Sequence, residues 1–89
     1  MSTKPFQLTI ATPEGVVFHG EVTSVVVPAA EGYLGVWANH APLVAALRRG
    51  RLTYRSPDGA EQSGAVDGGT VEVLKDRATI LTPQWEEAS

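Results

Sequence analysis

Cysteine is absent from all 89 residues of the chain. This absence excludes a disulfide framework and a zinc site built on thiolates, and it suits a reducing compartment. Histidine is scarce too, because His19 and His40 are the only two and neither has a second ligand at a metal-binding spacing. We therefore expect neither a metal site nor a bound cofactor.

Long apolar runs are also absent, and none approaches the ~20 residues that a membrane-spanning helix needs. The first eight residues lack the apolar core of a secretory signal, so secretion is not expected. The formal net charge of −3 argues against nucleic acid as a main partner, because duplex binding depends on neutralising phosphates. The length allows one domain, which we place at residues 1–83, followed by a polar tail at residues 84–89.

Groups that could perform catalysis are present but scattered. Neither Ser24 nor Ser63 lies in a nucleophile elbow, and no base or orienting residue is marked beside them. The carboxylates of Glu14 and Glu31 are more simply explained as solvated turn residues. The glycines of residues 31–35 do not have the spacing of a phosphate-binding loop. This inventory predicts a protein that is not an enzyme.

The chain does contain strand-like alternation of apolar and polar residues. Phe6, Leu8 and Ile10 alternate with polar neighbours, which is the period of a strand buried on one side. Residues 22–27 form a nearly continuous β-branched run, which suits burial on both faces. Such short segments, separated by turns at regular intervals, predict an all-β fold, an antiparallel sandwich or barrel.

Turn signals divide these segments. The strongest is Ser-Pro-Asp-Gly at residues 56–59, where proline presets the turn and glycine accepts a positive φ. It predicts a hairpin that joins residues 51–55 to residues 61–66. A further turn is predicted at residues 67–69, Asp-Gly-Gly, and it would end the second strand of that hairpin.

One segment, residues 39–50, fits two interpretations. A capping-type Asn39, an early proline, a run of good helix formers and a final Gly50 are typical of a short helix. The strand-rich flanks favour a strand instead. The residues of the segment alone leave both interpretations open.

Arginines gather around the end of this segment. If the chain is extended here, Arg49, Arg51 and Arg55 share one face while Leu52 and Tyr54 take the other. A solvated strand face is the simpler interpretation. The alternative is a patch that meets an acidic protein neighbour.

Aromatic residues are few, but three of them lie near loops or the chain end: Tyr33, Trp37 and Trp85. Burial in the core is the ordinary expectation for each of them. Tyrosine and tryptophan are also favoured anchors at protein interfaces, because they bring large rigid area and one polar group. We therefore consider Trp37, together with Arg49, Arg51 and Arg55, as a possible partner-contact patch.

Six motifs follow one another in a familiar order and at familiar spacings: Thr12-Pro13-Glu14-Gly15, Phe18-x-Gly20-Glu21-Val22, Ala30-Glu31-Gly32-x-Leu34-Gly35-Val36, His40-Ala41-Pro42-Leu43, Gly50-x-Leu52 and Gly68-Gly69-x-Val71-Glu72-Val73. With them the chain resembles the epsilon subunit of F-type ATP synthase over residues 6–81. The resemblance implies a ten-stranded flattened antiparallel β-sandwich or barrel. It also favours a strand over a helix for residues 39–50.

The resemblance implies a function as well. Epsilon is a non-catalytic rotor subunit at the foot of the central stalk, where it helps couple proton flow through the c-ring to ATP synthesis. Its β-domain binds the gamma subunit and rests on the c-ring. A protein of this kind would lie peripherally on the cytoplasmic face of the bacterial inner membrane, through the complex rather than by its own insertion.

Contact with the c-ring is implied for Glu31, Gly32, Tyr33, Leu34 and His40. Tyr33 departs from the family, since many members have a second acidic residue there. If these residues form one contact, Glu31 and His40 should be exposed and close together at one end of the domain.

A second departure is that the chain ends before the pair of C-terminal helices present in most members of the family. The sequence is compatible with a short form and with a shortened chain. The competing hypothesis from another class is a free-standing β-sandwich that binds a small ligand or peptide. That hypothesis requires a deep apolar pocket with convergent polar groups.

Overall fold

The strands of this protein are short at the N-terminal end and long in the middle of the chain. The structure is a computed structural model and describes residues 4–88. Those residues form eight strands: β1 (Phe6–Thr12), β2 (Gly15–Val22), β3 (Ser24–Ala29), β4 (Gly32–Val36), β5 (Leu43–Arg55), β6 (Glu61–Leu74), β7 (Arg77–Leu81) and β8 (Trp85–Glu87). The all-β prediction is confirmed.

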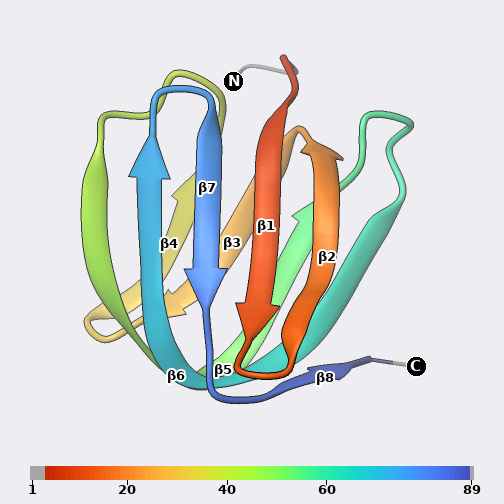
Figure 1. Cartoon of the computed structure of the whole chain (residues 1–89). Coiled ribbons are helices and arrows are strands. Elements are labelled where there is room, and N and C mark those ends of the chain that lie inside the picture. The colour runs from red at the N-terminus through yellow and green to blue at the C-terminus, as the bar shows by residue number, and fades with distance from the viewer. Residues whose placement is uncertain (1–3, 89) are drawn as a thin grey trace.

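The strands pair in the order β2-β1-β7-β6-β5-β3-β4, and β8 pairs with β6 outside this path. Figure 1 shows how one sheet makes two layers, because β5 and β6 curve together from the front layer into the back layer. The front layer holds β2, β1 and β7, and the back layer holds β3 and β4. All pairs are antiparallel except β1 with β7, which run parallel.

The expected count of ten strands is wrong by two, and β5 and β6 explain the difference. In β5 the inward side chains change from odd positions, such as Leu47, to even positions, such as Leu52. In β6 they change from even positions, such as Val66, to odd positions, such as Val71. Each of these long strands therefore serves both layers, and counting each as two strands would give ten.

The prediction of a turn at residues 67–69 is also wrong, because β6 continues through these residues from one layer into the other. Gly68 and Gly69 have φ values of 85° and 107°, but they lie inside β6 and bend it without ending it. A Cβ built on Gly69 would overlap the carbonyl oxygen of Leu81. Glycine is therefore required at position 69 both by the left-handed backbone and by the close approach of β7.

Residues 39–50 contain no helix. Asn39 adopts a φ of 65° within a turn, and β5 begins at Leu43. Along the first half of β5, Leu43, Ala45 and Leu47 alternate with more exposed residues, which is the period of a strand. The interpretation as a strand is confirmed.

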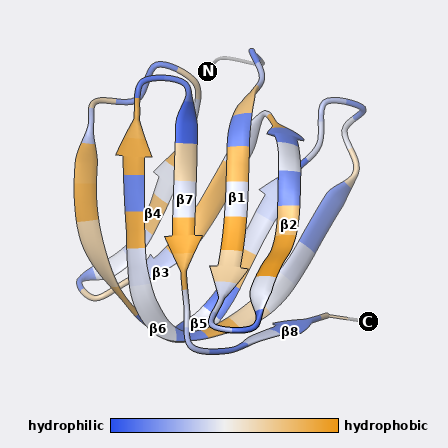
Figure 2. Cartoon of the chain, in the orientation of Figure 1, coloured by the Kyte–Doolittle hydropathy of each residue, from blue (hydrophilic) through white to orange (hydrophobic). Residues whose placement is uncertain are grey.

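The core lies between the two layers, and its aliphatic residues come from every strand except the short β8. An aromatic pair, Phe18 and Tyr54, joins β2 to β5 across the layers with ring centroids 4.5 Å apart. Figure 2 shows apolar residues on strands of both layers and polar residues in the connections. The residues buried to 2% exposure or less include Leu8, Ile10, Val22, Val25, Val27, Val36, Leu52, Val66, Val71, Val73, Ala78 and Ile80.

Part of the tail predicted at residues 84–89 belongs to the sheet. Within it, Trp85–Glu87 form β8, which pairs with Gly64–Val66 of β6. The described residues contain no helix that is both long and apolar enough to span a membrane.

Candidate functional site

The turn between β3 and β4 is the part of the molecule where most of the predicted contact residues meet. Ala29 pairs with Gly32 at the base of the turn, and the Ala30 N–H donates to the Ala46 carbonyl at 2.9 Å. Gly32 has a φ of 135°, a conformation that glycine adopts at little cost. Glu31 is exposed at the tip. This backbone pairing ties the turn to both β3 and β5.

Tyr33 is held on the outer side of β4 by an arginine that sequence reasoning left out of the site. The guanidinium carbon of Arg48 lies 5.4 Å from the centroid of the Tyr33 ring, within the range of a cation–π contact. Arg48 Nε also donates to the Ala29 carbonyl at 3.1 Å. Tyr33 nevertheless keeps 59% of its surface exposed. A large aromatic surface is thus presented to solvent beside Arg48.

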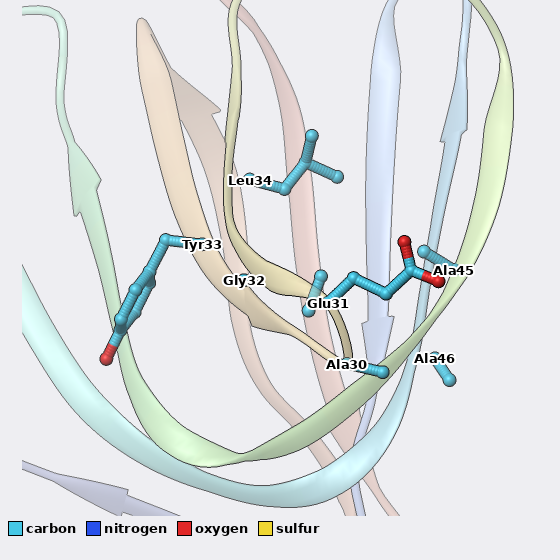
Figure 3. Close-up of a pocket in the computed structure, with 8 residues that line it drawn as sticks. Ala30, Glu31, Gly32, Tyr33, Leu34, Ala45 and Ala46 are labelled. Carbon is cyan, nitrogen blue, oxygen red and sulfur yellow. The ribbon is translucent and has the colours of Figure 1, made fainter.

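An open groove lies on the other side of β4. It has a volume of about 530 Å³ and is lined by Ala29, Ala30, Glu31, Gly32, Tyr33, Leu34, Ala45 and Ala46. In Figure 3 the Glu31 side chain reaches toward Ala45, whereas the Tyr33 ring points away on the opposite side of the ribbon. Of these lining residues only Glu31 carries a charge. The groove therefore lacks the several convergent polar groups that the ligand-binding hypothesis requires.

His40 does not join this site, and the expectation that it lies close to Glu31 is wrong. The turn that carries Glu31 precedes β4, and the loop of residues 37–42 follows it at the opposite end of the domain (Figure 1). Five strand residues at about 3.3 Å each separate the two by roughly 16 Å. His40 is half-buried, and its Nδ1 lies 2.7 Å from the Ala41 carbonyl oxygen. This contact of its ring thus lies within its own loop.

The arginine face of β5 is arranged as predicted. Arg49, Arg51 and Arg55 are exposed, whereas Leu52 and Tyr54 are buried. The alternation is a consequence of the strand period.

Acidic residues of β6 face two of these arginines. Arg49 Nε lies 3.8 Å from an Asp67 carboxylate oxygen, and Arg55 donates to Glu61 at 3.3 Å. Exposed pairs of this kind contribute little to stability. The surface is a stripe of both charges, which favours the interpretation as a solvated strand face.

Trp37 is also less available than an interface anchor would be. It is half-buried, and its ring covers Gly35, where a Cβ would come within 2.7 Å of the indole. Gly35 thus provides the space into which Trp37 folds. The patch of Trp37 with the three arginines stays a prediction.

Two titratable side chains, Tyr54 and Asp58, have a shifted pKa. Burial, and secondarily the charge of Glu87, raises the pKa of Tyr54 in the core. A hydrogen bond from Ser56 Oγ, assisted by the Ala60 N–H, lowers the pKa of Asp58 in the β5–β6 turn. Within residues 4–88, no three His, Asp or Glu side chains are grouped as metal ligands.

Comparisons with known proteins agree with one another. The family model for the β-sandwich domain of the ATP synthase delta/epsilon chain matches residues 5–88. The chain is 38% identical over 89 residues to the ATP synthase epsilon chain of Syntrophomonas wolfei, covering all of this chain and 65% of that relative. It is 42% identical over 81 residues to the epsilon chain of Chlorobium limicola, covering 91% of this chain and 92% of that one.

Solved structures show the same fold. A chain of the Euglena gracilis mitochondrial ATP synthase, in a structure of OSCP, F1 and the c-ring, matches with a TM-score of 0.89 at 22% identity. The match covers 93% of this chain and 53% of the Euglena chain. A chain of the central stalk and c-ring of Tetrahymena thermophila ATP synthase matches with a TM-score of 0.79 at 15% identity. At these identities the likeness concerns the fold alone.

Proposed function

The chain belongs to the family of the ATP synthase delta/epsilon chain β-sandwich domain, and from this membership we propose that it acts as an epsilon-type subunit of the central stalk. The observation that carries the proposal is the family match over residues 5–88, supported by epsilon-chain relatives at about 40% identity. The proposed role is to couple proton flow through the c-ring to ATP synthesis without performing catalysis itself. The protein would be peripheral to the membrane, on the cytoplasmic face in a bacterium.

The contact with the c-ring is proposed for the turn and first half of β4, residues Glu31, Gly32, Tyr33 and Leu34. The turn is tied to β5 by the Ala30–Ala46 hydrogen bond, so load applied at its tip would pass into the sheet. Glu31 supplies a charge that fixes register and partner choice more than affinity. The exposed Tyr33 ring supplies rigid contact area in place of a second acidic residue. His40 is not included in this contact because it lies beyond the other end of β4.

The contact with the gamma subunit is proposed for the outer face of the back layer, which includes Trp37, Arg49, Arg51 and Arg55. A surface with both charges, such as the stripe of β5 and β6, suits selection among partners. Two contacts on different sides of one closely packed domain allow torque to pass between two partners, because packed interiors deform little under load.

The decisive experiment uses ATP synthase assembled with this subunit and reconstituted into vesicles. We expect ATP synthesis driven by a proton gradient to fall when the subunit is omitted and to recover when it is added back. A Glu31→Lys substitution should weaken retention on the c-ring, measured by co-purification of the subunit with the assembled complex. Glu14→Lys, at another exposed turn, is the matched control.

The outcome that would reject the proposal is fully coupled synthesis in the absence of the subunit. Equal loss of retention with the Glu31 and Glu14 variants would reject the assignment of the β3–β4 turn. In that case the omission experiment alone would decide whether the subunit acts in the stalk.

A further inference from the structure

The strand β8 fits the edge of β6 through its side chains as well as its backbone. Trp85 pairs with Val66, and Glu87 pairs with Gly64. A Cβ built on Gly64 would overlap the Trp85 ring and would come within 2.8 Å of the Glu86 carbonyl oxygen. The indole packs against the hydrophobic core. Glycine at position 64 therefore makes a seat for an aromatic side chain at this edge.

One arginine beside the seat, Arg51, complements the acidic residues of β8. Arg51, Ala65 and Glu86 lie in one row across β5, β6 and β8. Arg51 and Glu86 both lie opposite Ala65, so their side chains leave the same face of the sheet, with their Cα atoms about 10 Å apart. Arg51, Gly64, Ala65, Glu86 and Glu87 line a shallow groove of about 450 Å³. Within residues 4–88, no ion pair occupies Arg51.

The attachment of β8 itself is slight. It has three residues, and one further hydrogen bond, from the Ala88 N–H to the Ser63 carbonyl, extends the pairing. The segment that leads into it is fixed at Thr82, whose hydroxyl accepts from the Asp67 N–H and donates to the Gln84 carbonyl. Short edge pairings of this kind open more readily than the rest of a sheet.

From this geometry we propose that the edge of β6 at Gly64–Val66, together with Arg51, is a binding site for an extended peptide segment that carries an aromatic residue followed by two carboxylates. The chain's own β8 is its resident occupant. A segment of the same chemistry from another protein binds by adding a strand to β6, which is an established mode of peptide recognition. This segment takes the place of β8 and supplies the equivalent backbone hydrogen bonds, aromatic ring and carboxylates. The site goes beyond the proposed function, because its occupant is a peptide and not another subunit of the complex, although it shares Arg51 with the face proposed for the gamma subunit.

The test uses the full chain with Trp85→Ala, which empties the seat, and a capped peptide of the sequence PQWEEA. Titration is followed by the amide resonances of ¹⁵N-labelled protein. We expect saturable shifts at Gly64, Ala65 and Val66, with affinity in the millimolar to high micromolar range. A peptide in which alanine replaces the tryptophan should bind at least tenfold more weakly.

Two further substitutions, each made in the Trp85→Ala chain, measure separately how much the aromatic seat and the Arg51 charge contribute to peptide binding. Gly64→Val should abolish the shifts by filling the seat, and Arg51→Glu should weaken binding severalfold. A peptide with two lysines in place of the glutamates should recover the loss in the Arg51→Glu protein.

If Trp85→Ala does not fold, the unaltered chain replaces it, and displacement of β8 is followed by the indole N–H resonance of Trp85. Absence of saturable shifts at residues 64–66, or equal binding of the peptides with and without the aromatic residue, would overturn the proposal. Neither result bears on the stalk role, which is tested by omission of the subunit.

Discussion

Replacing Gly69 with alanine is the sharpest test of how β5 and β6 serve both layers. Gly69 lies inside β6 with a φ of 107°, and an added Cβ would overlap the Leu81 carbonyl oxygen and approach Leu81 C and Thr82 Cα to 2.9 Å each. These neighbours are backbone atoms of β7 and its end, so they cannot turn aside as a flexible side chain would. Either β7 moves away from β6, or the backbone of Gly69 leaves its left-handed conformation.

The expected magnitude follows from two contributions. A non-glycine residue in the left-handed region costs about 1–2 kcal/mol. Crowding that displaces packed backbone adds about 1–3 kcal/mol. A domain of this length has a free energy of unfolding of roughly 4–13 kcal/mol, so Gly69→Ala should remove a large part of it.

The assay is equilibrium unfolding in urea, followed by the far-ultraviolet circular dichroism of the sheet. Gly59→Ala is the matched control, because Gly59 has a φ of 93° but nothing lies within 4 Å of an added Cβ. We expect Gly59→Ala to lower the free energy of unfolding by only about 1–2 kcal/mol, which is the conformational cost of the left-handed backbone. If Gly69→Ala and Gly59→Ala lose equal stability, the close approach of β7 to the bend in β6 plays no energetic role and the reasoning is refuted.

Three further predictions concern other parts of the chain. Leu52→Ala should lower the free energy of unfolding in urea by about 2–5 kcal/mol, because Leu52 is fully buried; a loss below 1 kcal/mol would contradict its place in the core. Arg48→Ala should leave the fold intact but release the Tyr33 ring, seen as faster side-chain and backbone motion of Tyr33 in NMR relaxation; unchanged relaxation at Tyr33 would argue against the cation–π contact. The pKa of Asp58 is lowered in the folded state by the Ser56 hydroxyl, so its contribution to stability is complete above the unfolded-state pKa of about 4 and is lost as the pH falls through the lower folded pKa. Asp58→Asn should therefore reduce the melting temperature at pH 7 more than at pH 2, and an equal reduction at both would exclude this linkage.

Much of the sheet could be predicted from the sequence, because strand alternation is a local property. Phe6, Leu8 and Ile10 revealed β1, and Ser-Pro-Asp-Gly at residues 56–59 revealed the hairpin of β5 and β6. The alternation of Arg51 and Arg55 with buried residues also follows from the strand period alone. These features depend on neighbours within a few positions of the chain.

The features that could not be predicted from the sequence depend instead on residues far apart in the chain. The bend at Gly68 and Gly69 looks like a turn unless the passage of Leu81 beside it is known. The pairing of β8 depends on Gly64, which lies some twenty positions earlier and carries no strand signal of its own. The separation of His40 from Glu31 depends on the direction of β4. None of these could be obtained without the three-dimensional neighbours.

The parallel pairing of β1 with β7 has a consequence for how this chain is made. Gln7 pairs with Arg77, seventy positions later, so the hairpin of β1 and β2 gains its second neighbour only after β7 has left the ribosome. Until then β1 presents an unpaired margin at which nascent chains can associate with one another. Closure over so long a loop is slow compared with formation of the β5–β6 hairpin. A nascent chain that ends before residue 77 would therefore be prone to aggregation, and synthesis of β7 is the step that protects the N-terminal strands.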